Sequence, residues 1–257
     1  MSTPIRIEPV EERWLAPLSF GLEVMGKSVR EVAASDILFT QRPPTARAAI
    51  PMIPILLALL ASYLLGSVPF GLVMAKLIKG VDLREVGSGN IGATNAMRVL
   101  GKPLGLMAFS LDFAKGLVPT LYFAGFASDL NAQAPLLAES LCGVCAVVGH
   151  CFPLYLRFKG GKGVATGCGA IVGVAPMVFV ASGLVWILTL GVGRMVSLAS
   201  MAMGLAFPIA AWFLVPGAPV FAAACVLLTI LVLVRHRANI ARIRLGSEPR
   251  IGTKTPA

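Results

Sequence analysis

The run Gly163–Gly193 reads GVATGCGAIVGVAPMVFVASGLVWILTLGVG and holds no charged residue over its 31 positions. An α-helix of about 20 apolar residues already crosses the hydrocarbon core of a bilayer, which is about 30 Å thick. Gly173 and Pro176 interrupt the run near its middle, and membranes tolerate such breaks where neighbouring helices re-satisfy the freed backbone groups. The run therefore predicts two shorter helices inside a membrane.

The rest of the chain is almost as poor in charge as this run. Hydrophobic residues make up 57% of the 257 positions and charged residues 13%, with a mean hydropathy of +0.84. Soluble domains carry about 25% charged residues, so this composition argues against a soluble helical protein. The apolar runs predict spans near 53–76, 103–126, 134–152, 164–190, 196–214 and 218–234.

The basic residues, which give the chain a net charge of +10, lie between these apolar runs. The linker Lys76–Lys102 holds five basic and two acidic residues, and the tail Arg235–Ala257 holds six basic residues and one acidic residue. The positive-inside rule places both segments in the cytoplasm. Six spans would separate them, whereas dividing Gly163–Gly193 gives seven and puts them on one side. We expect an all-α polytopic transmembrane helical bundle of about seven helical segments. The first span should begin outside and the C-terminus should be cytoplasmic.

Residues 1–50 differ from the membrane domain predicted for residues 51–257. They hold six basic and six acidic residues and lack the apolar core of a signal peptide. We expect a poorly ordered N-terminal extension. A misassigned start site is the alternative, because Met52 directly precedes the first span.

A polar block, Gly87–Arg98 (GSGNIGATNAMR), stands out in a chain made mainly of Leu, Val and Ala. Three glycines within six residues let the backbone turn tightly and approach a ligand, and successive N–H groups can then bind an anion. Thr94 or Asn95 is expected to cap a following helix, and Arg98 supplies a planar charged group suited to phosphate. An ordinary surface turn is the alternative interpretation.

Two further polar blocks follow. In the segment FKGGKG, Lys162 lies between glycines, where its ammonium and nearby N–H groups can reach a phosphate; a charge that only orients the span is the alternative. In the tail RHRANIAR, His236, Asn239 and Arg242 recur every third residue, so they share one side of a helix that continues from the last span. A plain basic end to that span would explain the same residues.

Two buried polar features are interpreted as structural. Asp112 and Lys115 stand three residues apart within one span, where charges tend to pair, so we expect an ion pair there. His150 ends an apolar run and is expected to have a structural role. Five cysteines lie in or beside apolar runs and act as small apolar fillers. No cluster of metal ligands at suitable spacing is present, so we expect no metal and no cofactor.

These blocks together resemble the acyl-phosphate:glycerol-3-phosphate acyltransferase family, the PlsY type of bacterial phospholipid synthesis, over about residues 53–251. The extension of residues 1–50 is the main departure from its pattern. The blocks that carry the resemblance are Gly66-Ser67-x-Pro69, Asp82-x-Arg84-x-x-Gly87-Ser88-Gly89-Asn90-x-Gly92-Ala93-Thr94-Asn95-x-x-Arg98, Asp112-x-x-Lys115-Gly116, Gly149-His150-x-Phe152-Pro153, Gly160-Gly161-Lys162-Gly163-Val164-Ala165-Thr166 and Arg235-His236-Arg237-x-Asn239-Ile240-x-Arg242.

The resemblance implies an enzyme that transfers a fatty acyl group from acyl phosphate to the 1-hydroxyl of glycerol 3-phosphate, forming lysophosphatidic acid and inorganic phosphate. It implies a multi-pass protein of the bacterial inner membrane, with its active site facing the cytoplasm and a functional link to the enzyme that supplies acyl phosphate. Membrane lipid, but no nucleic acid, is expected as a further partner. The expected catalytic residues are His236, Asn239 and Ser88. The expected substrate-binding residues are Ser67, Arg84, Gly89, Asn90, Gly92, Thr94, Asn95, Arg98, Gly161, Lys162 and Gly163.

Within this interpretation, both substrates carry phosphate, so fixed positive groups and N–H donors must offset their repulsion. The Gly87–Asn95 loop is assigned to the acyl-phosphate headgroup, and Arg98 and Lys162 to the phosphates. His236 and Asn239 are placed near the reacting hydroxyl. A transporter of a phosphorylated solute is the rival hypothesis, but the sequence lacks the repeated halves typical of transporters. A non-enzymatic scaffold would leave the three polar blocks unexplained.

Overall fold

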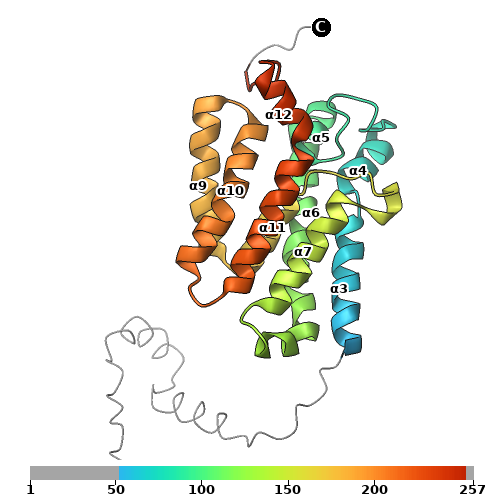
Figure 1. The fold of residues 1–257 in the computed structure, drawn as a ribbon. Helices are drawn as coiled ribbons and strands as arrows, with labels where there is room; N and C mark the ends of the chain where they lie inside the picture. The colour runs from blue at the N-terminus through green and yellow to red at the C-terminus, as the bar shows by residue number, and fades with distance from the viewer. Residues whose placement is uncertain (1–51, 253–257) are drawn as a thin grey trace, which may run out of the picture. The chain divides into compact units, whose positions relative to one another are not determined.

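The computed structural model describes residues 52–252, and every regular element in that part of the chain is a helix (Figure 1). The extension expected at residues 1–50 lies outside the described residues. The elements are α3 (Met52–Ser67), α4 (Phe70–Lys79), α5 (Ala93–Leu100), α6 (Lys102–Val118), the π-helical η2 (Pro119–Phe123), the 3₁₀-helical η3 (Ala124–Ala132), α7 (Leu137–Cys151), the 3₁₀-helical η4 (Leu154–Leu156), α8 (Val164–Val174), α9 (Pro176–Gly193), α10 (Val196–Leu214), α11 (Pro219–Arg235) and α12 (Arg237–Arg244).

The described helices include seven apolar segments, as the sequence predicts. Five stretches are long and apolar enough to cross a membrane: 52–79, 102–132, 137–156, 176–193 and 196–214. A sixth is α11 when it is counted with α12, and α8 is a shorter apolar helix of 11 residues. The long uncharged run is divided as expected, because α8 ends at Val174 and α9 begins at Pro176. Proline is accommodated at the first position of a helix, where its missing N–H costs no hydrogen bond.

The two basic segments lie at the same end of the bundle. Figure 1 shows α4, α5 and α12 at one end, whereas α3 begins at the opposite end. The chain enters α8 and leaves α9 at this same end, because Lys162 before α8 contacts Asn239 and Arg194 after α9 contacts Ile251 of the tail. The long run therefore forms two helices that run in opposite directions. The number of apolar segments becomes odd, which places both basic segments at one end, as expected. Which end faces the cytoplasm stays a prediction.

Glycines allow the helices on one side of the bundle to touch through their backbones. Gly66 of α3 lies against the backbone of Ala146 in α7, so a Cβ at Gly66 would overlap the Ala146 carbonyl. A Cβ at Gly116 of α6 would likewise meet the Thr166 carbonyl of α8. Close approach through small residues is how helices associate in lipid, where water does not drive apolar surfaces together. These contacts hold α3 closely against α7 and α6 closely against α8.

The predicted ion pair within the membrane is present. Lys115 Nζ lies 2.9 Å from Asp112 Oδ1, and both side chains are almost completely buried. Lys115 also donates to the Val68 carbonyl at 2.8 Å, where Pro69 interrupts the α3–α4 span. Charges at this depth persist only when they are paired, so the pair stabilises the break between α3 and α4.

Candidate active site

The second and third polar blocks meet at the end of the bundle that carries the basic segments. Lys162, in the loop between α7 and α8, donates a 2.7 Å hydrogen bond to Asn239 Oδ1 of α12. These residues are 77 positions apart. The positive charge of Arg98, in α5, acts on Lys162 as well, so the first block lies within electrostatic range of the same point. The fold thus joins the second and third blocks directly, and the charge of Arg98 from the first block acts on the same point.

The Gly-rich loop of the first block is organised by Asn95. This side chain is buried, accepts from the Ser88 N–H at 2.9 Å and donates to the carbonyls of Leu83 and Val86. Helix α5 begins at Ala93 with Gly92 as its N-cap residue, so the expected cap by Thr94 or Asn95 is wrong. The Asn95 amide instead forms hydrogen bonds with backbone groups that the tight turns leave unpaired.

The surface of this loop presents small polar groups. Gly89 adopts a left-handed backbone with a φ of 68°, and Ser88 beside it is exposed. The Asn90 side chain accepts from the Gly92 N–H at 2.9 Å, which closes a second local turn. Thr94 is exposed on the first turn of α5. The loop therefore offers a hydroxyl and turned backbone groups to the outside.

Two predicted binding residues are engaged elsewhere in the structure. Ser67 is buried at the end of α3, and its hydroxyl donates to the Tyr63 carbonyl at 2.8 Å. Arg84 is exposed and forms hydrogen bonds with the Asp82 carboxylate at 2.9 and 2.6 Å. The guanidinium of Arg84 holds the pKa of Asp82 well below its usual range. In the structure, therefore, the Ser67 side chain binds within α3, and the Arg84 side chain binds within the linker.

The glycine loop before α8 is pressed against α7. Gly161 donates its N–H to the His150 carbonyl at 3.0 Å, and a Cβ on Gly161 would overlap His150 Nε2. Gly163 adopts a left-handed backbone with a φ of 79°, immediately before α8 begins. Lys162 stands between these two glycines, so the backbone on both sides of it is restricted to glycine by contact or by conformation.

Glu248 is the centre of the third block. Its Oε1 accepts from Asn239 Nδ2 and from the Ser197 hydroxyl, both at 2.6 Å, and its Oε2 accepts from Arg242 Nε at 2.7 Å. These bonds orient the Asn239 amide so that its oxygen faces Lys162. Sequence reasoning did not predict a role for Glu248. The available signal was that it is the one acidic residue in the basic tail.

The chain bends at His236. The continuous helix expected from α11 into the tail is wrong, because α11 ends at Arg235 and α12 starts at Arg237 with a 57° change of direction. His236 is buried, and its Nδ1 lies 2.7 Å from the Val232 carbonyl. A carbonyl can only accept, so Nδ1 carries the proton and Nε2 keeps the free lone pair of the neutral ring. The bend turns α12 toward the glycine loop, which allows Asn239 to reach Lys162.

The electrostatics of the cluster centre on Lys162. Burial lowers the pKa of its ammonium to about 8; the Glu248 carboxylate opposes this shift, and the charges of Arg242, Arg98 and Arg235 add to it. Burial alone would raise the pKa of Glu248, but hydrogen bonds from Ser197, Asn239 and Arg242 hold it below its ordinary value. Arg98 is exposed, and its guanidinium donates no hydrogen bond within residues 52–252. An excess of positive charge at one point is suited to binding an anion.

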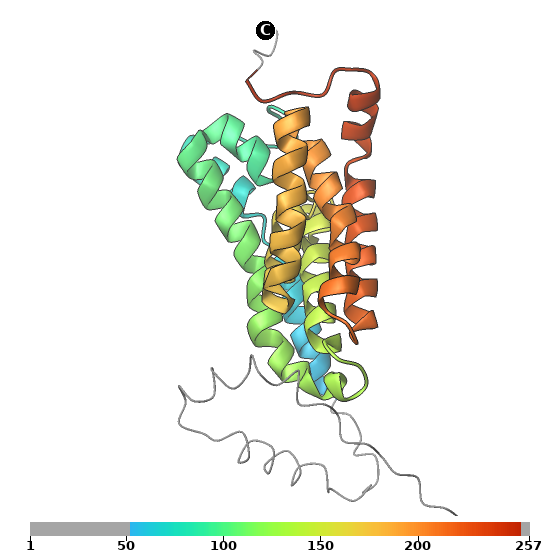
Figure 2. The ribbon, with the colours of Figure 1, turned by 90° about the vertical axis from the view of Figure 1, so that its left-hand side faces the viewer.

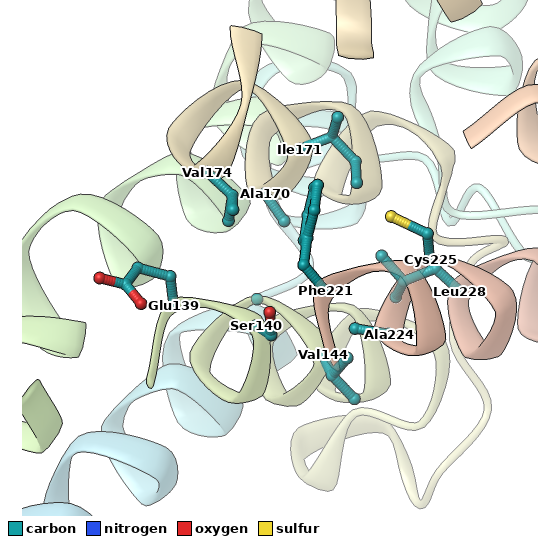
Figure 3. Close-up of a pocket in the computed structure, with 11 residues that line it drawn as sticks. Glu139, Ser140, Val144, Ala170, Ile171, Val174, Phe221, Ala224, Cys225 and Leu228 are labelled. Atoms are coloured by element: carbon teal, nitrogen blue, oxygen red, sulfur yellow. The ribbon is translucent and has the colours of Figure 1, made fainter. Parts of the chain in front are cut away.

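An apolar hollow between α7, α8 and α11 lies away from this cluster (Figure 3). Phe221 stands in its middle. Ser140, on its wall, precedes His150 by ten residues of α7, which corresponds to about 15 Å along a helix. The hollow therefore belongs to the apolar interior of the bundle and contains none of the predicted site residues.

Comparison with known proteins identifies the family. Residues 56–246 match the family model described as glycerol-3-phosphate acyltransferase. The chain is 46% identical over 199 residues to the glycerol-3-phosphate acyltransferase of Rhodospirillum rubrum, which covers 77% of this chain and 91% of that protein.

The fold matches crystal structures of PlsY (YgiH), an integral membrane glycerol 3-phosphate acyltransferase. The glycerol 3-phosphate form is matched with a TM-score of 0.70 at 40% identity, covering 77% of this chain and 96% of that chain. The lysophosphatidic acid form is matched with a TM-score of 0.68 at 39% identity and the same coverage. These matches favour the enzyme over the transporter and the scaffold. The chain therefore belongs to the glycerol-3-phosphate acyltransferase family and is an integral membrane enzyme.

Proposed function

We propose that the enzyme takes its acyl group from an acyl phosphate and transfers it to the 1-hydroxyl of glycerol 3-phosphate. The products are lysophosphatidic acid and inorganic phosphate, in the first acylation step of phospholipid synthesis. The contact between Lys162 and Asn239 supports this most directly, because it joins two polar blocks beside a third and concentrates positive charge where two phosphates have to be held. The related PlsY structures in glycerol 3-phosphate and lysophosphatidic acid forms support the acceptor and the product.

The roles of the residues follow from the chemistry of a mixed anhydride. Ser88, Gly89 and Asn90 bind the acyl-phosphate headgroup through a hydroxyl and turned backbone groups, on the loop whose shape Asn95 maintains. Arg98 and Lys162 bind the phosphates. Arg84, Gly92, Gly161 and Gly163 act through the loops that they shape. Ser67 acts through the end of α3, and Thr94 through its exposed hydroxyl.

His236 and Asn239 lie beside the glycerol hydroxyl that attacks the acyl carbonyl. When the carbonyl–phosphate bond breaks, the phosphate leaves as an anion and can take up the hydroxyl proton itself. The neutral His236 ring keeps Nε2 available as an acceptor for the same hydroxyl. Much of the acceleration then comes from holding the hydroxyl and the carbonyl in reacting geometry.

The test is a phosphate-release assay on the purified enzyme. Phosphate should appear from an acyl phosphate only when glycerol 3-phosphate is added, with lysophosphatidic acid in equal amount. Acyl-CoA, offered as the alternative donor with the same chain length, should give no lysophosphatidic acid. Transfer from acyl-CoA at a comparable rate would overturn the proposed donor while leaving the acyltransferase assignment intact.

The role of His236 is tested by the variant His236→Ala. A group that helps to activate the hydroxyl acts mainly in the transition state, so kcat should fall by about 10²-fold while KM for glycerol 3-phosphate changes little. The measurement is steady-state kinetics of phosphate release. A rise in KM at unchanged kcat would make His236 a binding residue instead.

We also propose that the charged end faces the cytoplasm of a bacterial inner membrane, where an enzyme supplying acyl phosphate has access to it. The clustering of basic residues at this end supports that orientation. A lysine-reactive reagent that does not cross membranes should label the exposed Lys159 in inverted vesicles and not in intact spheroplasts. Labelling in spheroplasts alone would reverse the orientation.

A further inference from the structure

Arg235, the last residue of α11, holds two consecutive carbonyl groups of the loop that carries Lys162. Its Nε donates to the Gly161 carbonyl at 2.8 Å, and its Nη2 donates to the Gly160 carbonyl at 2.5 Å. The guanidinium carbon also lies 5.5 Å from the centre of the Phe152 ring. Reaching two acceptors and an aromatic face together requires a planar group with several fixed donors, which lysine does not have.

The opposite side of the same loop is closed by α7. Gly161 donates its N–H to the His150 carbonyl at 3.0 Å, and a Cβ at Gly160 would overlap that carbonyl. A Cβ at Gly161 would overlap the His150 ring. The two glycines are thus held between His150 on one side and the Arg235 guanidinium on the other, and Lys162 is the next residue along the chain.

We infer that Arg235 is a positioning residue for Lys162. By holding the Gly160 and Gly161 carbonyls it sets the backbone from which the Lys162 ammonium reaches Asn239 and the substrate phosphate. This inference rests on the proposed function, which supplies that phosphate. Two of the three guanidinium nitrogens of Arg235 already bind the protein. The guanidinium of Arg98, by contrast, is exposed and donates no hydrogen bond within the described residues.

The variant Arg235→Lys tests this role, since it keeps the positive charge and loses the planar pair of donors. A catalytic group displaced by about 1 Å costs on the order of 10²-fold in rate, so kcat should fall by about 10- to 100-fold. KM for glycerol 3-phosphate should stay within about threefold, because Lys162 and Arg98 still supply charge to the phosphate. The matched control is Arg237→Lys, two residues away and exposed, which should retain wild-type kinetics.

A double variant separates positioning from direct phosphate binding. If Arg235 acts through Lys162, then Arg235→Lys combined with Lys162→Ala should be no slower than Lys162→Ala alone, because coupled residues are not additive. Additive losses would overturn the inference, as would a rise in KM of more than tenfold at unchanged kcat. Phe152→Leu serves where Arg235→Lys does not purify. It removes the ring beneath the guanidinium and should lower kcat by about two- to fivefold.

Hydrogen–deuterium exchange gives a readout that does not depend on activity. In Arg235→Lys, peptides covering residues 158–163 should exchange faster than in the wild type, while peptides from α9 should be unchanged. Unchanged exchange in the loop overturns the inference whatever the kinetics. If the wild-type protein does not release phosphate from acyl phosphate, the proposed function is overturned. If the wild type is active and Arg235→Lys is equally active, only the role of Arg235 is overturned.

Discussion

Helices α8 and α9 come from one uncharged run of sequence, yet they occupy opposite environments. In α8, all six residues from Thr166 to Ile171 are buried, whereas α9 buries only Val178 and Ser182. Figure 2 shows α9 on the outside of the bundle, facing the viewer. The amino-acid composition explains the difference, because α8 has glycines where it meets α6, and α9 presents large aliphatic side chains to lipid. Hydropathy does not separate them, since lipid tails are as apolar as the bundle interior.

The largest expected effect is on activity, and it compares one basic residue next to each helix. Lys162 precedes α8 and Arg194 follows α9. Lys162→Ala should lower kcat/KM by about 10²- to 10³-fold, the usual cost of removing a donor that stabilises charge in a transition state. Arg194→Ala, the matched control, removes an exposed side chain that donates to the Ile251 carbonyl and should leave the kinetics unchanged. Equal effects in the phosphate-release assay would show that α8 does not carry the site.

The next comparison uses one isoleucine from each helix. Ile171 of α8 is 1% exposed and Ile187 of α9 is 60% exposed. Ile171→Ala should destabilise the protein by about 2–5 kcal/mol, because it leaves a cavity in a packed interior. Ile187→Ala should cost less than about 0.5 kcal/mol, as is usual for surface positions. Thermal unfolding of both variants in the same detergent measures the difference, and similar losses would contradict the peripheral position of α9.

A glycine pair tests why α8 is inside. A Cβ at Gly169 of α8 would overlap the Phe113 carbonyl of α6, whereas a Cβ at Gly183 of α9 has nothing within 4 Å. Gly169→Ala should therefore destabilise by about 1–3 kcal/mol through overpacking. Gly183→Ala should be neutral or slightly stabilising, because alanine restricts the unfolded chain more than glycine does. The readout is again the unfolding temperature in detergent, and a stable Gly169→Ala protein would remove close α6–α8 contact as the cause.

The smallest expected effect is on the pH dependence of activity. The pKa of Lys162 is about 8, so its ammonium is largely protonated at pH 7 and largely neutral at pH 9. If that charge binds phosphate, kcat/KM should fall about tenfold from pH 7 to pH 9, since this ratio reports the free enzyme. Arg194 after α9 carries a guanidinium that stays charged throughout. In Lys162→Arg the decline should disappear even if the overall rate is lower; an unchanged decline would assign it to another group.

The parts of the candidate site that depend only on the type of residue were predictable from the sequence. Gly-rich segments and Lys162 stand out against apolar surroundings, and their meeting at one end of the bundle follows from the parity of seven segments. The environments of Arg84 and Asn95 were not predictable, because their partners are backbone carbonyls and a nearby carboxylate that only the folded linker brings within reach. Glu248 was missed for the same reason, since its three donors come from two helices.

The sequence by itself determined that the chain is a helical membrane protein with about seven apolar segments, and that the long uncharged run breaks near Gly173 and Pro176. Those properties depend on local composition and on backbone groups that must be satisfied within each helix. Only the tertiary structure decided which apolar helix lies inside, that α11 and α12 bend at His236, and which carbonyls Arg235 holds. Contacts between segments far apart in the chain settle these matters, and hydropathy carries no information about them because lipid and protein interior are equally apolar.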